Sequence, residues 1–268
     1  MPELPEVESA RAVIARAGLR REIVGVDDTD SYVCRPHPPG QIRDALLGRS
    51  LTAAHRRGKS MWCDAGDDGP ELGIHLGMSG KIVIADPDGT EIDGGDYWEG
   101  RRGSGDYRWT RFALTFADGG RLILVDPRRL GRVRLNPPIA GLGPDAATMT
   151  PAEFRAALAT GRAPVKARLL DQESIAGIGN LLADQILWSA RVNPARRVDR
   201  LTADDVDRLL RATRRAVRSA IKDGGVHTLG IVPFRFPGGH CPRDGAPMTK
   251  TTVGGRTSWW CSREQELR

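Results

Sequence analysis

The first regular pattern along the chain is a stripe of apolar residues at helical spacing near its start. Pro5 suits a first helical turn, where its missing N–H would have no partner. Gly18 is a typical residue to end a helix. The pattern therefore predicts a helix over residues 5–18. Its apolar face comprises Val7, Ala10, Val13, Ile14 and Ala17.

From the end of this helix to about residue 135, short β-rich runs alternate with turn signals. The runs FALTF and RLILV flank Ala-Asp-Gly-Gly, which is a strong hairpin signal. Residues 86–106 are rich in Asp and Gly and predict a long exposed loop. This half of the chain is therefore expected to be mostly sheet.

Helical patterns follow residues 136–150, a stretch that is rich in Pro and Gly and has no period. The expected helices begin at Thr150-Pro151, where a capping pattern stands, and continue over 164–171, 180–190 and 202–222. This order predicts a segregated α+β protein and disfavours a doubly wound nucleotide-binding fold. The predicted parts are an N-terminal domain 1–135, a linker 136–150, a helical domain 151–225, and a small irregular tail 226–268 with two short strands.

Composition narrows the class of protein only slightly. The basic residues outnumber the acidic ones by 40 to 34, and most are arginines, which favours a polyanionic partner. No apolar run is long enough for a membrane span and no signal peptide is present, so a cytoplasmic protein is expected. Four cysteines make no disulfide framework, and Cys34 and Cys63 are interpreted as small core or surface thiols.

Several short segments carry candidate chemistry, each beside a plainer interpretation. In IAGIGNLLADQ a glycine turn leads into a helix at Asn180, which suits an anion, or Asn180 is simply an N-cap. In DPRRL an apolar residue stands beside two arginines, as a wedge for a base stack would need, or the turn is merely solvated. Met78 lies on a glycine-bounded turn in HLGMSG, where the plainer interpretation is a core residue. Lys59 follows a glycine in a predicted hairpin, where the plainer interpretation is a solvated charge.

The tail holds a different constellation. Cys241 and Asp244 form C-x-x-D, Cys261 and Glu264 form C-x-x-E, and sixteen residues separate the two motifs. The layout is that of two zinc knuckles across a hairpin, each with one cysteine replaced by a carboxylate.

Together and in this order, PELPEVE, HLGMSG, DPRR, GIGN and GGRT resemble the formamidopyrimidine-DNA glycosylase / endonuclease VIII family over essentially the whole chain. The PELPE start is similar to the formamidopyrimidine branch. The resemblance implies an N-terminal β-sandwich flanked by helices and a C-terminal helix–two-turn–helix bundle with a small β-hairpin finger. It also implies a base-excision-repair DNA glycosylase for oxidised bases, with abasic-site lyase activity by β,δ-elimination.

The resemblance assigns roles to individual residues. Removal of Met1 would leave Pro2 with a secondary amine, the nucleophile for the sugar C1′, and an α-amino group has a pKa of roughly 7.7–8. Glu3 would handle protons, and Glu6 would support the helix start. Lys59, which the resemblance also places among the catalytic residues, would bind a phosphate, as would Asn180 and Arg256. Met78, Arg129 and Leu130 would fill the space left by an extruded base.

The implied partner is double-stranded DNA with a damaged base or an abasic site. The chemistry needs no cofactor, and a monomer in a bacterial-type, nucleoid-associated setting is expected. The alternative from another class is a catalytically inactive paralogue that binds lesions. An intact Pro2, Glu3, Glu6 and Lys59 argue against it, because binding alone needs no N-terminal amine.

The sequence departs from the family pattern in three places. Leu130 stands where the branch usually has phenylalanine, and residues 225–241 are short for a loop that covers flipped 8-oxoguanine, so oxidised pyrimidines, ring-opened purines or hydantoins become comparable substrates. The finger has lost two of four thiolates. Three alternatives follow for the finger. It has no zinc and is held by Trp259, Trp260 and hairpin packing, or it binds zinc through its Cys and carboxylate residues, or with His240 as a substitute ligand. The third alternative is a Cys241–Cys261 disulfide.

Overall fold

The computed structural model describes residues 2–95 and 107–267, which form two compact units. One unit contains Pro2 and residues 6–140, and the other contains residues 3–5 and the chain from Gly141 onward. The division falls inside the stretch 136–150. The contacts of residues 3–5 group them with the C-terminal unit, whereas the sequence predicts one N-terminal domain over residues 1–135.

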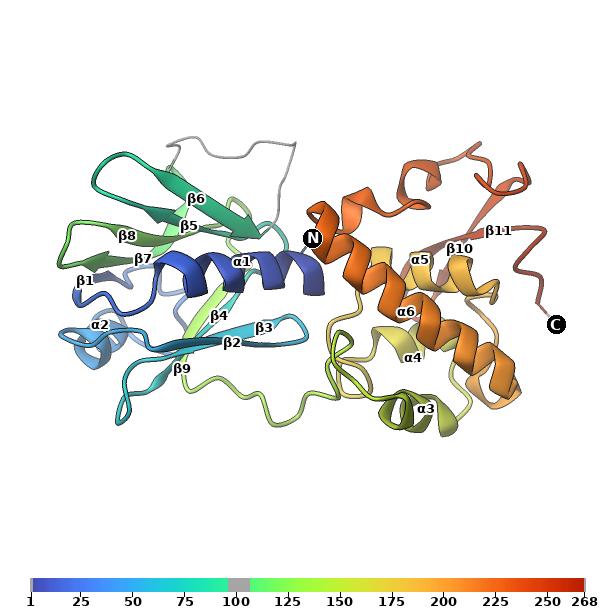
Figure 1. The fold of residues 1–268 in the computed structure, drawn as a ribbon, viewed down its shortest axis with the longest axis horizontal. Helices are drawn as coiled ribbons and strands as arrows, with labels where there is room; N and C mark the ends of the chain where they lie inside the picture. The colour runs from blue at the N-terminus through green and yellow to red at the C-terminus, as the bar shows by residue number, and fades with distance from the viewer. Residues whose placement is uncertain (1, 96–106, 268) are drawn as a thin grey trace. The chain divides into compact units, whose positions relative to one another are not determined.

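The N-terminal unit is a β-sandwich of two antiparallel sheets around one apolar core (Figure 1). One sheet has the strand order β1-β7-β8-β5-β6, formed by β1 (Ile23–Asp27), β7 (Thr110–Phe116), β8 (Arg121–Val125), β5 (Lys81–Ala85) and β6 (Glu91–Gly95). The other has the order β2-β3-β4-β9, formed by β2 (Ala53–Arg57), β3 (Ser60–Asp64), β4 (Glu71–His75) and β9 (Arg132–Leu135). The predicted hairpin is confirmed, since Leu114 of β7 pairs with Leu122 of β8.

Helix α1 (Leu4–Ala17) runs along the sandwich and contacts both sheets (Figure 1). Its apolar stripe enters the sandwich core, as its helical period predicts. On one side the Arg11 guanidinium donates to the carbonyl of Ala54 on β2. On the other side Gly94 of β6 lies so close to α1 that a Cβ there would be 2.5 Å from the carbonyl oxygen of Ser9.

Two elements of this unit correct the sequence prediction. The short helix α2 (Gln41–Leu46) interrupts the stretch expected to be strands, and its N-terminal N–H groups are bound by Asp28, a residue twelve to fifteen positions earlier. The predicted loop 86–106 contains strand β6, which pairs with β5 along its length. Residues 96–106 of that predicted loop lie outside the described part of the chain.

The C-terminal unit is helical, and its predicted helices are confirmed almost to the residue. They are α3 (Pro151–Ala159), α4 (Val165–Leu170), α5 (Asn180–Ala190) and α6 (Ala203–Asp223). Thr150 and Thr202 form capping boxes that begin α3 and α6, and Gly224 in the left-handed region ends α6. Short 3₁₀ turns η2 (Val198–Arg200), η3 (Val226–Thr228) and η4 (Val232–Phe234) connect these elements.

The tail ends in the two strands that the sequence predicted, β10 (Met248–Val253) and β11 (Arg256–Cys261), paired as a hairpin. Gly254 and Gly255 form the turn, both with positive φ. A small apolar cluster under the hairpin includes Trp259, Met248 and Ile231. Among residues 2–95 and 107–267, none of the helices combines the length and apolarity that crossing a bilayer requires.

Candidate functional site

The candidate catalytic residues at the chain start are all buried. Pro2 precedes α1, and Glu6 lies in its first turn with 2% of its surface exposed. Glu3 is 1% exposed. A buried carboxylate is stable only when hydrogen-bonded or paired, and the partners of Glu3 lie in the C-terminal unit.

The Glu3 carboxylate accepts three backbone hydrogen bonds at the start of α5. Gly179 and Leu182 donate to Oε2 at 3.0 and 3.1 Å, and Leu181 donates to Oε1 at 2.8 Å. Gly179 is the N-cap of α5 and has no side chain to fill this role. The free N–H groups and the positive end of a helix dipole stabilise an anion there, so Glu3 acts as the cap of a helix that begins 177 positions later in the chain.

Asn180 is the first residue of α5, one position after the cap. The interpretation of Asn180 as an N-cap is therefore wrong, because Gly179 holds that position. The side-chain oxygen Oδ1 of Asn180 is buried and has no hydrogen-bond partner within the described residues. Its amide group lies at the helix start whose Gly179, Leu181 and Leu182 N–H groups bind the Glu3 carboxylate.

Lys59 lies in the tight turn between β2 and β3, after Gly58 in the left-handed region (φ 60°). Desolvation first, and then the charges of Lys59, Arg132 and Arg134, lower the pKa of His75 at the end of β4. Lys59 is thus one member of a group of basic side chains on neighbouring strands of the four-stranded sheet. The predicted Lys59 has basic neighbours that the sequence did not single out.

A groove of about 330 Å³ on this sheet is lined by His75, Arg132, Arg134 and Leu130, among others. Desolvation and the nearby charges of Arg35 and Arg134 lower the pKa of Arg132. Its Nε is buried without a hydrogen-bond partner in the part of the chain that the structure describes. Neighbouring cations that lower one another's pKa, together with a hydrogen-bond donor such as the Arg132 Nε, suit the binding of a polyanion.

The turns that carry Met78 and Leu130 touch each other. Gly77 has φ 60°, and a Cβ on it would be 2.4 Å from the backbone carbon of Leu130. Asp126, fully buried, accepts from the Ser79 hydroxyl at 2.6 Å and from the Gly131 N–H at 2.6 Å. One carboxylate therefore ties the HLGMSG turn, which carries Met78, to the DPRRL turn, which carries Leu130.

Arg129 lies on the same turn in the left-handed region (φ 55°) and is exposed, as is Leu130 at 40%. The Arg129 Nε is 2.9 Å from an oxygen of Asp30, and its guanidinium lies 5.7 Å from the ring centre of Tyr32. Burial raises the pKa of Asp30, but the hydrogen bonds from Arg129 and the Val33 N–H and the charge of Arg111 outweigh it and leave this pKa lowered. The side chain of Arg129 is thus held at one place.

Arg256 begins β11 directly after the hairpin turn and is exposed. The turn rests on helix α4, because a Cβ on Gly254 would be 2.9 Å from the Cβ of Ala167. Arg256 is therefore presented to solvent from a hairpin whose turn packs against a helix of its own unit.

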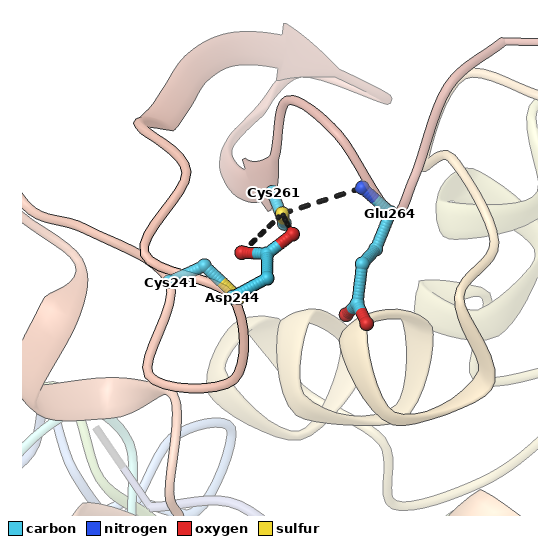
Figure 2. Close-up of side chains that lie close together, drawn as sticks. All are labelled: Cys241, Asp244, Cys261 and Glu264. Atoms are coloured by element: carbon cyan, nitrogen blue, oxygen red, sulfur yellow. Dashed lines mark hydrogen bonds between the residues drawn. The ribbon is translucent and has the colours of Figure 1, made fainter.

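The four tail residues singled out for a metal do converge. One ligand atom from each of Cys241, Asp244, Cys261 and Glu264 lies within 4.8 Å of all the others. Figure 2 shows Asp244 turned toward the Cys261 sulfur, which lies 3.5 Å from both its carboxylate oxygens. Each sulfur also receives an N–H: the Trp188 indole donates to Cys241 at 3.3 Å, and the Glu264 backbone donates to Cys261 at 3.4 Å.

The Glu264 carboxylate has other partners. It pairs with Arg243 and, at 3.3 Å, with Arg191, and in Figure 2 no dashed line joins this carboxylate to the Cys261 sulfur. His240 is exposed and does not belong to the converging group. A finger cluster of two thiols and two carboxylates therefore exists, with one carboxylate already held by arginines.

Sequence reasoning missed the basic groove and the carboxylate that joins the two turns. His75 lies inside HLGMSG and Asp126 inside DPRRL, but these motifs indicated Met78 and Arg129 as the functional residues. Arg132 and Arg134 alternate along β9 and so share one face of the sheet, a signal that period-2 patterning could have provided. That β9 pairs with β4 and brings them beside His75 could not be read from the sequence.

Comparison with protein families matches the chain in two consecutive segments. Residues 1–133 match the formamidopyrimidine-DNA glycosylase N-terminal domain, and residues 140–229 match the formamidopyrimidine-DNA glycosylase H2TH domain. A formamidopyrimidine-DNA glycosylase of Nocardioides sp. is 33% identical over 97% of this chain and 93% of its own length. That of Chloroflexus aurantiacus is 33% identical over 97% and 96%, respectively.

Solved structures give the same result for the fold. The Lactococcus lactis Fpg protein in complex with DNA containing an abasic site aligns with a TM-score of 0.81 and 26% identity, covering 98% of this chain and 99% of that one. The same protein in complex with DNA containing Fapy-dG aligns equally well, with coverages of 98% and 100%.

Proposed function

Because the chain belongs to the formamidopyrimidine-DNA glycosylase family, we propose that it is a DNA glycosylase with abasic-site lyase activity in base excision repair. The observation that carries the proposal is a buried carboxylate, Glu3, directly after the proline that becomes N-terminal when Met1 is removed. A carboxylate next to an amine, held by the N–H groups of Gly179, Leu181 and Leu182, supplies the two groups that the reaction needs.

In the proposed reaction, the Pro2 nitrogen attacks C1′ of the damaged nucleotide while the bond from C1′ to the base breaks. The departing base takes up a proton, and Glu3 handles the protons of this step and of the opening of the sugar ring. The resulting iminium is cationic because the nitrogen of proline is already secondary. It draws electrons when a proton leaves C2′, so that the bond from C3′ to the 3′ phosphate breaks. Loss of a proton from C4′ then breaks the bond from C5′ to the 5′ phosphate.

DNA would bind through its phosphates to the basic residues of both units. In the N-terminal unit these are Lys59 and the groove residues His75, Arg132 and Arg134. The pKa values of His75 and Arg132 are lowered, and a nearby anion would raise them again. In the C-terminal unit they are Asn180 at a helix start and the exposed Arg256. Duplex DNA as the partner implies that the protein acts in the nucleoid.

The joined turns would replace the extruded base. Met78 and Leu130 supply apolar surface and Arg129 supplies donors, and Asp126 fixes the turns relative to each other. Flipping a nucleotide costs a few kcal/mol, which such a plug offsets in part. Abasic sites and ring-opened purines, the lesions bound in the similar Lactococcus lactis structures, are the first substrates to test.

The reaction needs no cofactor, and the finger cluster fits a structural zinc ion. A tetrahedral site with Zn–S of about 2.3 Å and Zn–O of about 2.0–2.2 Å has S–O edges of about 3.5 Å, and Asp244 lies 3.5 Å from the Cys261 sulfur. The N–H groups that point at each sulfur are typical of thiolate ligands. Cys241, Asp244 and Cys261 would hold the ion, with Glu264 completing the set or remaining with its arginines.

Borohydride trapping tests the proposed function. The purified protein, with Met1 removal checked by mass spectrometry, is incubated with duplexes that carry an abasic site, Fapy-dG or 8-oxoguanine. A covalent band is expected on the abasic and Fapy-dG duplexes, and Pro2→Gly should weaken it because glycine keeps an amine but loses the ring. Pro87→Gly, at an exposed proline of the same unit, is the matched control. Intact binding without any covalent band would instead identify an inactive lesion-binding paralogue.

A further inference from the structure

A buried ionic cluster lies beneath the hairpin, and the proposed reaction does not use it. It consists of Lys166 on α4, Asp184 on α5 and Arg235 just after η4. The Lys166 Nζ donates to Asp184 Oδ1 at 2.6 Å, and the Arg235 Nε donates to Oδ2 at 2.9 Å. The side chains of Lys166 and Asp184 are 0% and 1% exposed, so the pair is sealed from water.

The same cluster binds the backbone of the finger on both sides of Ser258. Lys166 Nζ donates to the carbonyl of Thr257 at 2.8 Å, and the N–H of Trp259 donates to Asp184 Oδ2 at 3.1 Å. Thr257 directly follows Arg256. The backbone is thus fixed from one residue after Arg256 onward, and the turn before it rests on Ala167. The side chain of Arg256 itself stays exposed.

Asp184 lies on the same helix, α5, as Asn180, which the proposed function places on a DNA phosphate. It lies four residues, about one turn, after Asn180, and the start of this helix holds the Glu3 carboxylate. The short segment 225–241 is attached to the same helix a second time, because the Ile231 N–H donates to Gln185 Oε1 at 2.9 Å. A single helix therefore carries Asn180 at its start and the anchor of the finger in its middle.

We propose that Asp184 is a positioning residue, with Lys166 and Arg235 as its partners, and that it fixes the finger on α5 so that Arg256 and Asn180 meet DNA phosphates at a set spacing. In this arrangement the segment 225–241 serves as a strut through Arg235. The inference rests on the proposed function for the assignment of DNA phosphates to Arg256 and Asn180. It does not depend on any catalytic step.

The test is a double-mutant cycle in DNA binding as a function of salt. The full-length protein is titrated with a duplex that contains a tetrahydrofuran abasic analogue, which the lyase reaction cannot cleave. Each phosphate contact contributes a slope of about −0.9 to log K against log salt, so Arg256→Ala should reduce the slope by about one. Asp184→Asn should give the same reduction and weaken binding about tenfold at 0.1 M salt. In the Arg256→Ala background, Asp184→Asn should have almost no further effect.

Two further variants keep the test decisive. Arg235→Gln should shift the slope in the same direction as Asp184→Asn and covers the case that the latter does not fold, which a thermal melt reveals. Asp204→Asn, at an exposed aspartate of α6, is the matched control and should leave the slope unchanged.

Additive effects of Asp184→Asn and Arg256→Ala would overturn the proposal, since the aspartate would then act independently of Arg256. An unchanged slope in Arg256→Ala would also overturn it, by removing the phosphate contact. Failure of the trapping assay alone would leave the coupling intact, so the two proposals fail separately.

Discussion

The carboxylate of Glu3 occupies the space that a side chain at Gly179 would need. A Cβ at position 179 would lie 2.2 Å from the Glu3 Cδ and 2.5 Å from its Oε1. The φ of Gly179 is −113°, which any residue can adopt, so this glycine is required for space and not for conformation. Glu3 and the start of α5 are thus packed together within the C-terminal unit.

Gly179→Ala should therefore displace Glu3 from its three N–H donors. Hydrogen bonds to a charged group contribute about 1.5–3 kcal/mol each, and we expect a net loss of about 3 kcal/mol in the free energy of unfolding. Base excision in single turnover should fall at least about 100-fold, in line with the loss of a positioned acid–base group.

Gly141→Ala is the matched control for that variant. A Cβ at position 141 would meet no atom within 4 Å. Urea denaturation and single-turnover rates of both variants make the comparison. Equal behaviour of the two would show that the Glu3 carboxylate does not need its present place.

Asp126→Asn should destabilise the N-terminal unit by about 2–4 kcal/mol, because the buried anion accepts from both Ser79 and Gly131. In asparagine an NH2 group, which only donates, replaces one of the two acceptor oxygens, so one of these donors loses its partner. The urea midpoint measures the effect, and Asp68→Asn at an exposed turn is the control. The variant should also lose affinity for a duplex with an abasic analogue, since the turns of Met78 and Leu130 lose their common anchor. Unchanged affinity would show that the turns hold without the carboxylate.

His75 should make DNA binding depend on pH. Its pKa is lowered, so the folded protein resists protonation, and the associated stability is present above the unfolded pKa of about 6.5 and lost as pH falls through the folded pKa. Phosphates in the basic groove would raise this pKa again, and binding would then take up a proton. Affinity should rise more steeply between pH 7.5 and 5.5 than in His75→Gln.

Fluorescence anisotropy at constant ionic strength measures that difference. His240→Gln, at an exposed histidine of the tail, should keep the pH dependence of the unaltered protein. The groove assignment fails if His75→Gln retains it as well.

The finger cluster should bind one zinc ion per chain, measured by elemental analysis of protein prepared with added zinc. Asp244→Ala should lose most of the metal, because this carboxylate lies against the Cys261 sulfur. Glu264→Gln is the matched variant and should keep it, since that carboxylate is held by Arg243 and Arg191. Protein without metal, whose tryptophan fluorescence does not respond to a chelator, would instead support a zincless finger packed around Trp259.

The elements that the sequence predicted best are those with local signals. Thr150 and Thr202 form capping boxes with residues three positions later, and Gly224 ends α6. These helix ends are therefore determined by residues close to them in the sequence. The hairpin β7–β8 has its turn signal in the sequence in the same way. The α+β class followed from the order of the strand-rich and helical patterns along the chain.

The elements that were missed depend on residues far away in the chain. Helix α2 has only six residues and takes its N-terminal partner from Asp28, and β6 exists by pairing with the edge of β5. In the candidate site, the motifs indicated Glu3 and Asn180, but not that Glu3 caps the helix of Asn180. The basic groove depends on the pairing of β9 with β4, which no local pattern specifies.

The buried chain start has a practical consequence for anyone who expresses this protein. Leu4 is fully buried and its N–H donates to the carbonyl of Gly177 at 3.2 Å, so the backbone is held in place within three residues of Met1. An affinity tag at the amino end would have to leave this packed region and would also keep the Pro2 nitrogen in a peptide bond. Purification handles therefore belong at the carboxyl end, and an inactive preparation with an uncleaved amino-terminal tag is no evidence about the enzyme.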